Sequence, residues 1–225
     1  MEDIHVRAVW LNGSREDTQR CRALLSADEI ARADRFAFAH LTRSFEIAHG
    51  ALRLLLAAYL NTQPQRVQFT YGSHGKPALT SGSGLRFNMA HSRELALYAF
   101  TAGCEIGVDV EQVRSMPDLE SIAQRFFNKV EVTELMAVQG GPARTDAFFR
   151  CWTRKEAYMK AVGEGLSMGL DQVPGPDWNV RQFVPAESYA GAVAYQGERR
   201  QLTVHSPTAV SDVFATAASG RLSSI

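Results

Sequence analysis

Two acidic side chains alternate with apolar ones in the segment Gly107-Val-Asp-Val-Glu111, a composition typical of a β-strand. Alternate residues of a strand share a face, so Asp109 and Glu111 should point together to one side. Their carboxylates then lie about 7 Å apart at a rise of ~3.3 Å per residue, and they repel each other unless a cation or a basic group lies between them. Mg²⁺ suits such a pair, because it takes oxygen ligands from carboxylates, water and phosphate. Two solvated acids on an exposed strand are the alternative.

A second candidate segment, Trp152-Thr-Arg-Lys-Glu-Ala-Tyr-Met-Lys160, falls in a helix that we expect over residues 146–162. Lys155 and Glu156 are adjacent, and Glu156 and Lys160 lie one turn apart on the same face. Many of the neighbouring residues are apolar, which predicts that the helix is mostly buried. Charges on a buried helix need compensation, for example by a metal or a phosphate. The alternative is a surface ion pair between Glu156 and Lys160, which would add little stability.

Basic side chains that could contact phosphate come from three further segments. Lys76 lies in the loop Gly75-Lys-Pro77, and His91 belongs to Phe87-Asn-Met-Ala-His-Ser92 at the end of a predicted strand. Arg43 adds positive charge in the first third of the chain. Taken singly these are weak signals, since a loop lysine or a single histidine is more often solvated or structural.

Glu131 ends the segment Arg125-Phe-Phe-Asn-Lys-Val-Glu131, between two short predicted helices. Its carboxylate could act as a general base. It could equally cap the helix that follows, and the spacing alone does not distinguish the two roles.

Strands and helices that would position these residues follow one another along the chain. We expect strands at 4–11, 67–71, 85–89, 95–100 and 105–111, and helices from Ser26, at 42–60, 119–127, 130–137 and 146–162. The remainder is expected to form short strands at 178–183, 190–195, 201–205 and 212–217. The hairpin-like spacing over 85–111 favours an α+β fold over a doubly wound parallel sheet.

Composition narrows the functional classes. Among 225 residues, 45% are hydrophobic and the formal net charge is +0, so nothing in the overall charge favours a nucleic-acid partner. The three cysteines are an odd number without CxxC spacing, which favours a reducing compartment over a disulfide framework or a zinc site. We see neither a secretory signal nor a membrane-spanning segment, and therefore expect a cytoplasmic protein.

Taken in order, the motifs G-K-P, F-N-x-x-H-S, G-V-D-V-E, R-F-F-x-K-x-E and W-T-x-K-E-A-x-x-K resemble those of the 4′-phosphopantetheinyl transferases. The chain is most similar to the long, single-chain type that activates surfactin synthetase. The match runs from about Arg35 to Gly165. This resemblance implies a pseudo-dimer of two similar α+β halves, here about 1–104 and 105–225, acting as a monomer with its active site in the cleft between the halves.

The resemblance also implies roles for the candidate residues. The residues that match the family's metal ligands are Asp109, Glu111 and Glu156. Those that match its contacts to coenzyme A are Arg43, Lys76, Pro77, His91, Lys155 and Lys160. Those that match its catalytic residues are Glu131 and Lys160. One departure is Ala90, where the family usually has serine. A hydroxyl contact to the 3′-phosphate, worth about 1.5–3 kcal/mol for a hydrogen bond to a charged group, would be absent.

The implied reaction is the Mg²⁺-dependent transfer of 4′-phosphopantetheine from coenzyme A to a serine of an apo acyl or peptidyl carrier protein, releasing adenosine 3′,5′-bisphosphate. Two alternatives stay open at this point. A Mg²⁺-dependent nucleotide hydrolase could use the same acids and lysines, and a non-catalytic scaffold could bind coenzyme A or the carrier without turning it over.

Overall fold

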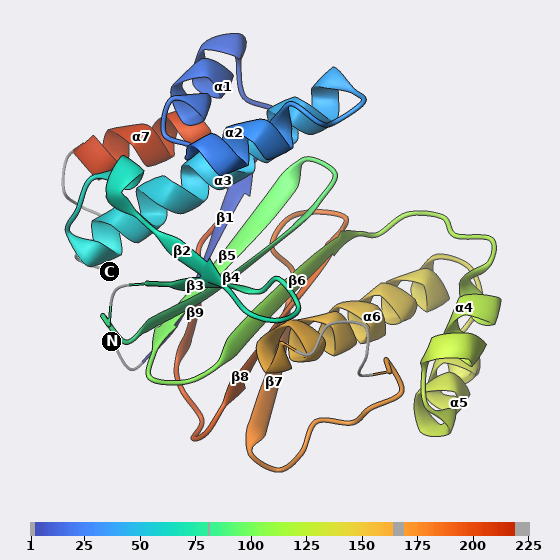
Figure 1. The fold of residues 1–225 in the computed structure, drawn as a ribbon. Coiled ribbons are helices and arrows are strands. Elements are labelled where there is room, and N and C mark those ends of the chain that lie inside the picture. The colour runs from blue at the N-terminus through green and yellow to red at the C-terminus, as the bar shows by residue number, and fades with distance from the viewer. Residues whose placement is uncertain (1–2, 81, 164–168, 219–225) are drawn as a thin grey trace.

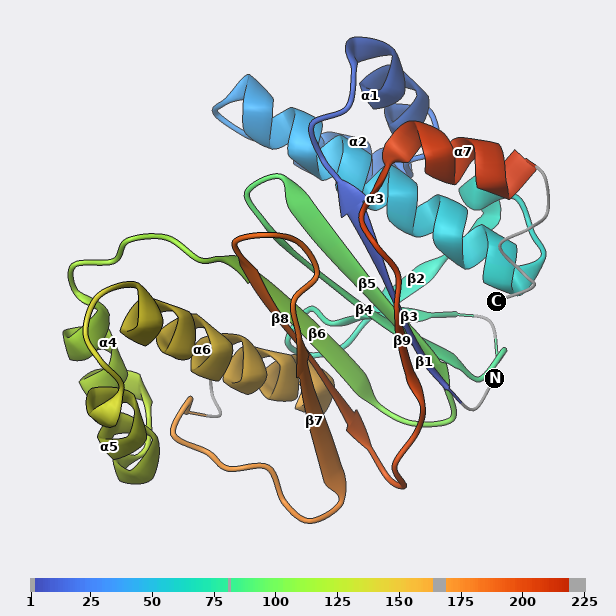
Figure 2. The ribbon, with the colours of Figure 1, turned by 180° about the vertical axis from the view of Figure 1, so that it is seen from behind.

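The computed structural model describes residues 3–80, 82–163 and 169–218. Within them, two β-sheets are each covered by a long helix, with α1–α3 and α7 gathered at one side of the molecule and α4–α6 at the other (Figures 1 and 2). The α+β class predicted from the sequence is confirmed, and each half of the fold combines a sheet with its own covering helix. No helix in these three ranges has the length and apolar character needed to cross a membrane.

The first sheet is built around β1, which pairs antiparallel with β5 and parallel with β9 and β10. β5 in turn pairs antiparallel with β4 at the edge of this sheet. Helix α3 covers it, and its buried side chains form a core with those of β5 and α7. The elements of this part are β1 Ile4–Trp10, α1 Arg15–Arg22, α2 Ala27–Ala33, α3 Ala39–Leu60, β4 Leu85–Ser92, β5 Leu95–Ala102, β9 Leu202–Val204, β10 Thr208–Ala209 and α7 Val210–Ala218.

The second sheet has the order β6-β8-β7, with antiparallel pairing throughout. Helix α6 packs on it through alanines, two from the helix and two from β8. A short 3₁₀ helix and the β2–β3 hairpin follow α3 and precede β4 in the sequence. The remaining elements are η1 Pro64–Arg66, β2 Phe69–Tyr71, β3 Pro77–Leu79, β6 Ile106–Gln112, α4 Leu119–Phe126, α5 Lys129–Ala137, α6 Pro142–Val162, β7 Trp178–Phe183 and β8 Tyr189–Gln196.

Most of the predicted elements occur close to their expected bounds, but the expected strand over 212–217 is wrong. This segment belongs to helix α7. Val210, Val213, Phe214 and Ala217 recur at helical spacing and pack against the core around α3, a period that the strand assignment overlooked. Strands β9 and β10, which precede this helix, add to the first sheet although they come from the end of the chain.

Two helices, α6 and α3, begin earlier than predicted. α6 begins at Pro142, because proline is favoured in the first helical turn, where its missing N–H is not needed. α2 follows Ser26 as predicted, with a complete capping box between Ser26 and Glu29. α3 begins at Ala39 without a side-chain cap, and its buried residues begin only at Phe45.

Candidate active site

Helix α6 lies unusually close to strand β6, and Gly107 is what allows this approach. A Cβ atom added at Gly107 would lie 2.2 Å from the carbonyl oxygen of Ala157 and 2.2 Å from the amide nitrogen of Ala161. Gly107, Asp109 and Glu111 share one face of the strand, so this face points to the helix. The opposite face, with Val108 and Val110, is buried in the core between the sheets. The acidic face of β6 is therefore covered by α6. The alternative of two solvated acids on an exposed strand is wrong.

Asp109 is the most buried acid at this junction, with 5% of the residue exposed. Its Oδ1 accepts a hydrogen bond from Lys160 Nζ at 2.6 Å, whereas its Oδ2 is buried without a partner among the described residues. Burial raises the pKa of Asp109 to about 7; the charge and hydrogen bond of Lys160 oppose this rise, and the charges of Glu156 and Glu111 add to it. A buried carboxylate oxygen without a donor is costly, so a further cationic partner at this atom would be stabilising.

Glu156 and Glu111 complete an acidic group with Asp109. Burial raises the pKa of Glu156, the positive charge of Lys160 opposes this, and the charge of Glu111 adds to it. Glu111 Oε2 accepts a hydrogen bond from Ser92 Oγ at 2.7 Å and lies 3.5 Å from Arg114 Nη1. Electrostatic repulsion thus links all three carboxylates. Among the residues that the structure describes, however, no three His, Cys, Asp or Glu side chains are arranged to hold a metal ion as they stand.

Lys160, Glu156 and Lys76 line one open cavity of about 280 Å³, together with Pro77 and Asn88. Lys76 reaches it from the loop before β3, where its ammonium group donates to Glu105 Oε2 at 2.9 Å and to the carbonyl oxygen of Ala161 at 2.7 Å. The cavity therefore joins residues from both halves of the fold. Of the predicted coenzyme A contacts, Lys76, Pro77 and Lys160 are brought together here.

His91 and Arg43 are both exposed, and neither lines this cavity. His91 is near enough to the acidic group for the charge of Glu111 to act on the imidazole. Partial removal of water, with the positive charges of His49 and Lys160, lowers the pKa of His91, while Glu111 opposes the shift. Arg43 lies on α3, in the turn before the buried stretch that begins at Phe45.

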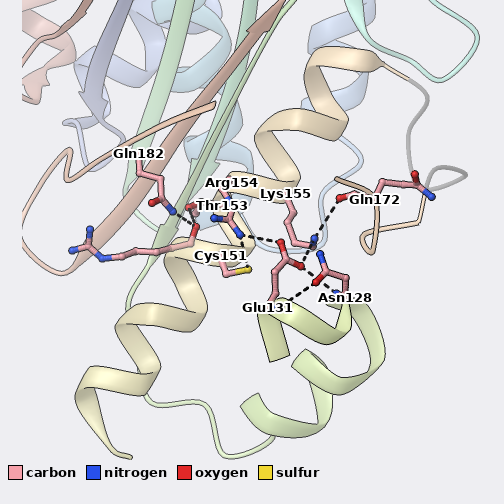
Figure 3. A network of polar contacts seen from close by, with 9 residues as sticks. Asn128, Glu131, Cys151, Thr153, Arg154, Lys155, Gln172 and Gln182 are labelled. Carbon is pink, nitrogen blue, oxygen red and sulfur yellow. Dashed lines mark hydrogen bonds and ion pairs between the residues drawn. The ribbon is translucent and has the colours of Figure 1, made fainter. Parts of the chain in front are cut away.

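Glu131 and Lys155 form a separate polar network on α5 and α6 (Figure 3). Lys155 Nζ donates to Glu131 Oε2 at 2.6 Å, and Arg154 Nη2 donates to Glu131 Oε1 at 2.9 Å. The Asn128 backbone N–H also donates to Glu131 Oε2, at 3.1 Å, as part of a capping box. Glu131 lines a second pocket with Arg154 and Cys151, which shares no residue with the cavity at Glu156. The capping role that the sequence left open is therefore present in the structure.

Two further positions at the site, in the motif Phe87-Asn-Met-Ala-His-Ser92, were not singled out by sequence reasoning. Asn88 Oδ1 accepts a hydrogen bond from the backbone N–H of Val108 at 2.9 Å, and Ser92 Oγ accepts one from the N–H of Gln112 at 3.2 Å. Both side chains therefore connect β4 to the strand that carries the acids. Their spacing of four residues, which places them on one face of a strand, was the signal available.

A model of the 4′-phosphopantetheinyl transferase superfamily matches residues 105–208, a range that holds the three acids, Glu131 and both helix lysines. The chain is 38% identical over 212 residues to the 4′-phosphopantetheinyl transferase HetI of Nostoc sp., covering 87% of this chain and 89% of that protein. It is 28% identical over 158 residues to the 4′-phosphopantetheinyl transferase Sfp of Bacillus subtilis, covering 70% of this chain and 69% of that protein. The chain belongs to the 4′-phosphopantetheinyl transferase superfamily. It is a transferase of that type, as the motifs predicted.

Proposed function

We propose that this transferase moves the 4′-phosphopantetheine group of coenzyme A to a serine of an apo acyl or peptidyl carrier protein, with Mg²⁺ as its cofactor. The observation that carries the proposal is the buried acidic group at the junction of β6 and α6, beside a cavity lined by Lys76 and Lys160. Acids that face a metal and lysines that face phosphates are what such a transfer requires, because it depends on positioning and charge neutralisation.

The acidic group fits Mg²⁺. Asp109 Oδ2 is buried without a donor, and the charges of Glu111 and Glu156 act on Asp109. A cation in contact with all three carboxylates would relieve this repulsion. We therefore propose Asp109, Glu111 and Glu156 as the residues that hold the metal, whose chemistry when bound is to neutralise the charge on the pyrophosphate.

The basic residues around the cavity are proposed to bind coenzyme A. Lys76 and Pro77, with His91 and Arg43 nearer the surface, would contact the adenosine 3′-phosphate and the adenine. Lys160 would face the pyrophosphate, since its ammonium group lies beside Asp109 and lines the same cavity. Lys155 is proposed as a further pyrophosphate contact, which would require it to exchange its bond to Glu131.

In the proposed reaction the hydroxyl oxygen of the carrier serine forms a bond to the β-phosphorus of coenzyme A. The bond from that phosphorus to the bridging oxygen breaks, and adenosine 3′,5′-bisphosphate leaves. Lys160 balances the charge on the leaving phosphate. Glu131 is proposed as the base that takes the serine proton, a role that must be separated by experiment from its capping bonds.

We further propose that the chain acts as a cytoplasmic monomer, with residues 1–104 and 105–225 as the two halves that form the cleft, although β9, β10 and α7 of the second range pack with the first sheet. A cavity lined by Lys76 and Pro77 from the first range and by Glu156 and Lys160 from the second supports this division.

Intact-mass analysis of apo-carrier proteins incubated with coenzyme A, Mg²⁺ and this protein tests the proposal. At least one carrier should gain the mass of one phosphopantetheine group, and the gain should require Mg²⁺. Asp109→Ala and Glu156→Ala should each abolish the gain while the circular dichroism spectrum stays native. Wild-type rates in either variant would remove the metal assignment, and coenzyme A consumption that needs no carrier would identify a hydrolase instead.

A further inference from the structure

Strands β4 and β6 lie side by side where the two sheets meet, but they belong to different hydrogen-bonded sheets. Side chains link them instead of a backbone ladder. Asn88 accepts from Val108 N–H, and Ser92 accepts from Gln112 N–H, so two bonds four residues apart keep the strands in one register. Both residues are buried, with 6% and 9% exposed.

Ser92 makes a second bond that Asn88 does not. Its hydroxyl group donates to Glu111 Oε2 at 2.7 Å, while its oxygen accepts a hydrogen bond from the backbone N–H of Gln112, the residue after Glu111. A hydroxyl has one proton, and here that proton is directed at the carboxylate. A bond of this length to an ionised acceptor is among the stronger hydrogen bonds in proteins. Among the ion pairs of the described residues, Glu111 has one partner, the half-exposed Arg114, whose Nη1 lies 3.5 Å from Glu111 Oε2.

We infer that Ser92 is a positioning residue for the metal, acting through Glu111. This inference rests on the proposed function, in which Glu111 and its two neighbouring acids hold Mg²⁺. Carboxylate ligands of metals are commonly oriented by an outer hydrogen-bond partner, and loss of that partner typically lowers metal affinity by about 10–100-fold. Ser92 joins the edge strand of the first sheet to an acid of the second, and so couples the two halves at the site.

The test measures binding of Mn²⁺, as a spectroscopic substitute for Mg²⁺, by electron paramagnetic resonance on the full chain without coenzyme A. Ser92→Ala should weaken Mn²⁺ binding by about tenfold or more. Ser92→Thr keeps the hydroxyl and should bind within threefold of the unchanged protein. Carrier modification by Ser92→Ala should recover as Mg²⁺ is raised, because the defect lies in metal affinity.

Asn88→Ala is the matched control, since it removes the other bond between the same two strands without touching an acid. It should lower the melting temperature as Ser92→Ala does, but change Mn²⁺ affinity by less than threefold. Equal loss of Mn²⁺ affinity in both variants would reduce Ser92 to a structural residue and overturn the inference. Unchanged affinity in Ser92→Ala would overturn it as well. If the wild-type protein neither bound Mn²⁺ nor modified a carrier, the proposed function itself would be contradicted.

Discussion

Replacing Gly107 by alanine should damage the site without touching any charged side chain. The new methyl group would lie 2.2 Å from backbone atoms of both Ala157 and Ala161, and neither can rotate away. Non-bonded carbon atoms pack at roughly 3.5–4.0 Å, so α6 must withdraw from β6 by about 1 Å. Lys160 and Glu156 would move with the helix, away from Asp109.

Both stability and turnover should respond. Overpacking of this kind costs about 1–3 kcal/mol of unfolding free energy. A displacement of 1 Å at reacting groups can lower the rate on the order of 100-fold. Urea unfolding and the rate of carrier modification by intact mass measure the two effects. Gly140→Ala is the control, because a Cβ there meets nothing within 4 Å and its φ is not positive. If Gly107→Ala kept wild-type stability and rate, the close approach of β6 and α6 would not be what sets the site.

Two further predictions concern the carboxylates of Glu131 and Glu29. Glu131→Gln should lower kcat in the carrier assay far more than it weakens coenzyme A binding measured by calorimetry; a loss of stability with no separate effect on kcat would support the capping role alone. Burial by itself would raise the pKa of Glu29, but hydrogen bonds from His49, the Ser26 backbone and Arg53, with the charge of Arg53, lower it from 4.5 to about 2. The ionised form is thus favoured in the folded state, and its contribution of about 3 kcal/mol, at 1.36 kcal/mol per pKa unit, is present above pH 4.5 and lost as the pH falls through 2. Urea unfolding of the parent and Glu29→Gln should therefore differ most near neutral pH and converge in acid, and a difference independent of pH would contradict the assignment.

Local patterns in the sequence predicted much of the site. The period of two in Gly107–Glu111 placed Asp109 and Glu111 on one face, and the spacing of Glu156 and Lys160 placed both on one face of α6. Neither prediction needed long-range information, because strand and helix periods follow from backbone geometry. The α+β class followed in the same way from the order and spacing of the elements.

Which acid or carbonyl group each lysine contacts could not be predicted from these local patterns. Lys160 bonds Asp109 across 51 residues and Lys76 bonds Ala161 across 85, whereas Lys155, adjacent to Glu156, turns to Glu131 on α5. Adjacent residues on a helix differ in direction by about 100°, so the rotation of α6 decides which lysine meets which acid.

By itself, then, the sequence determined the elements, the residues that share each face, and the family through motifs in a fixed order. Only the tertiary structure decided that the acidic face of β6 is buried under α6, that Gly107 permits this contact, and that Ser92 joins the first sheet to Glu111. The reason is physical. Which residues share a face follows from the local backbone period, but which faces meet depends on the packing of elements that are distant in the chain.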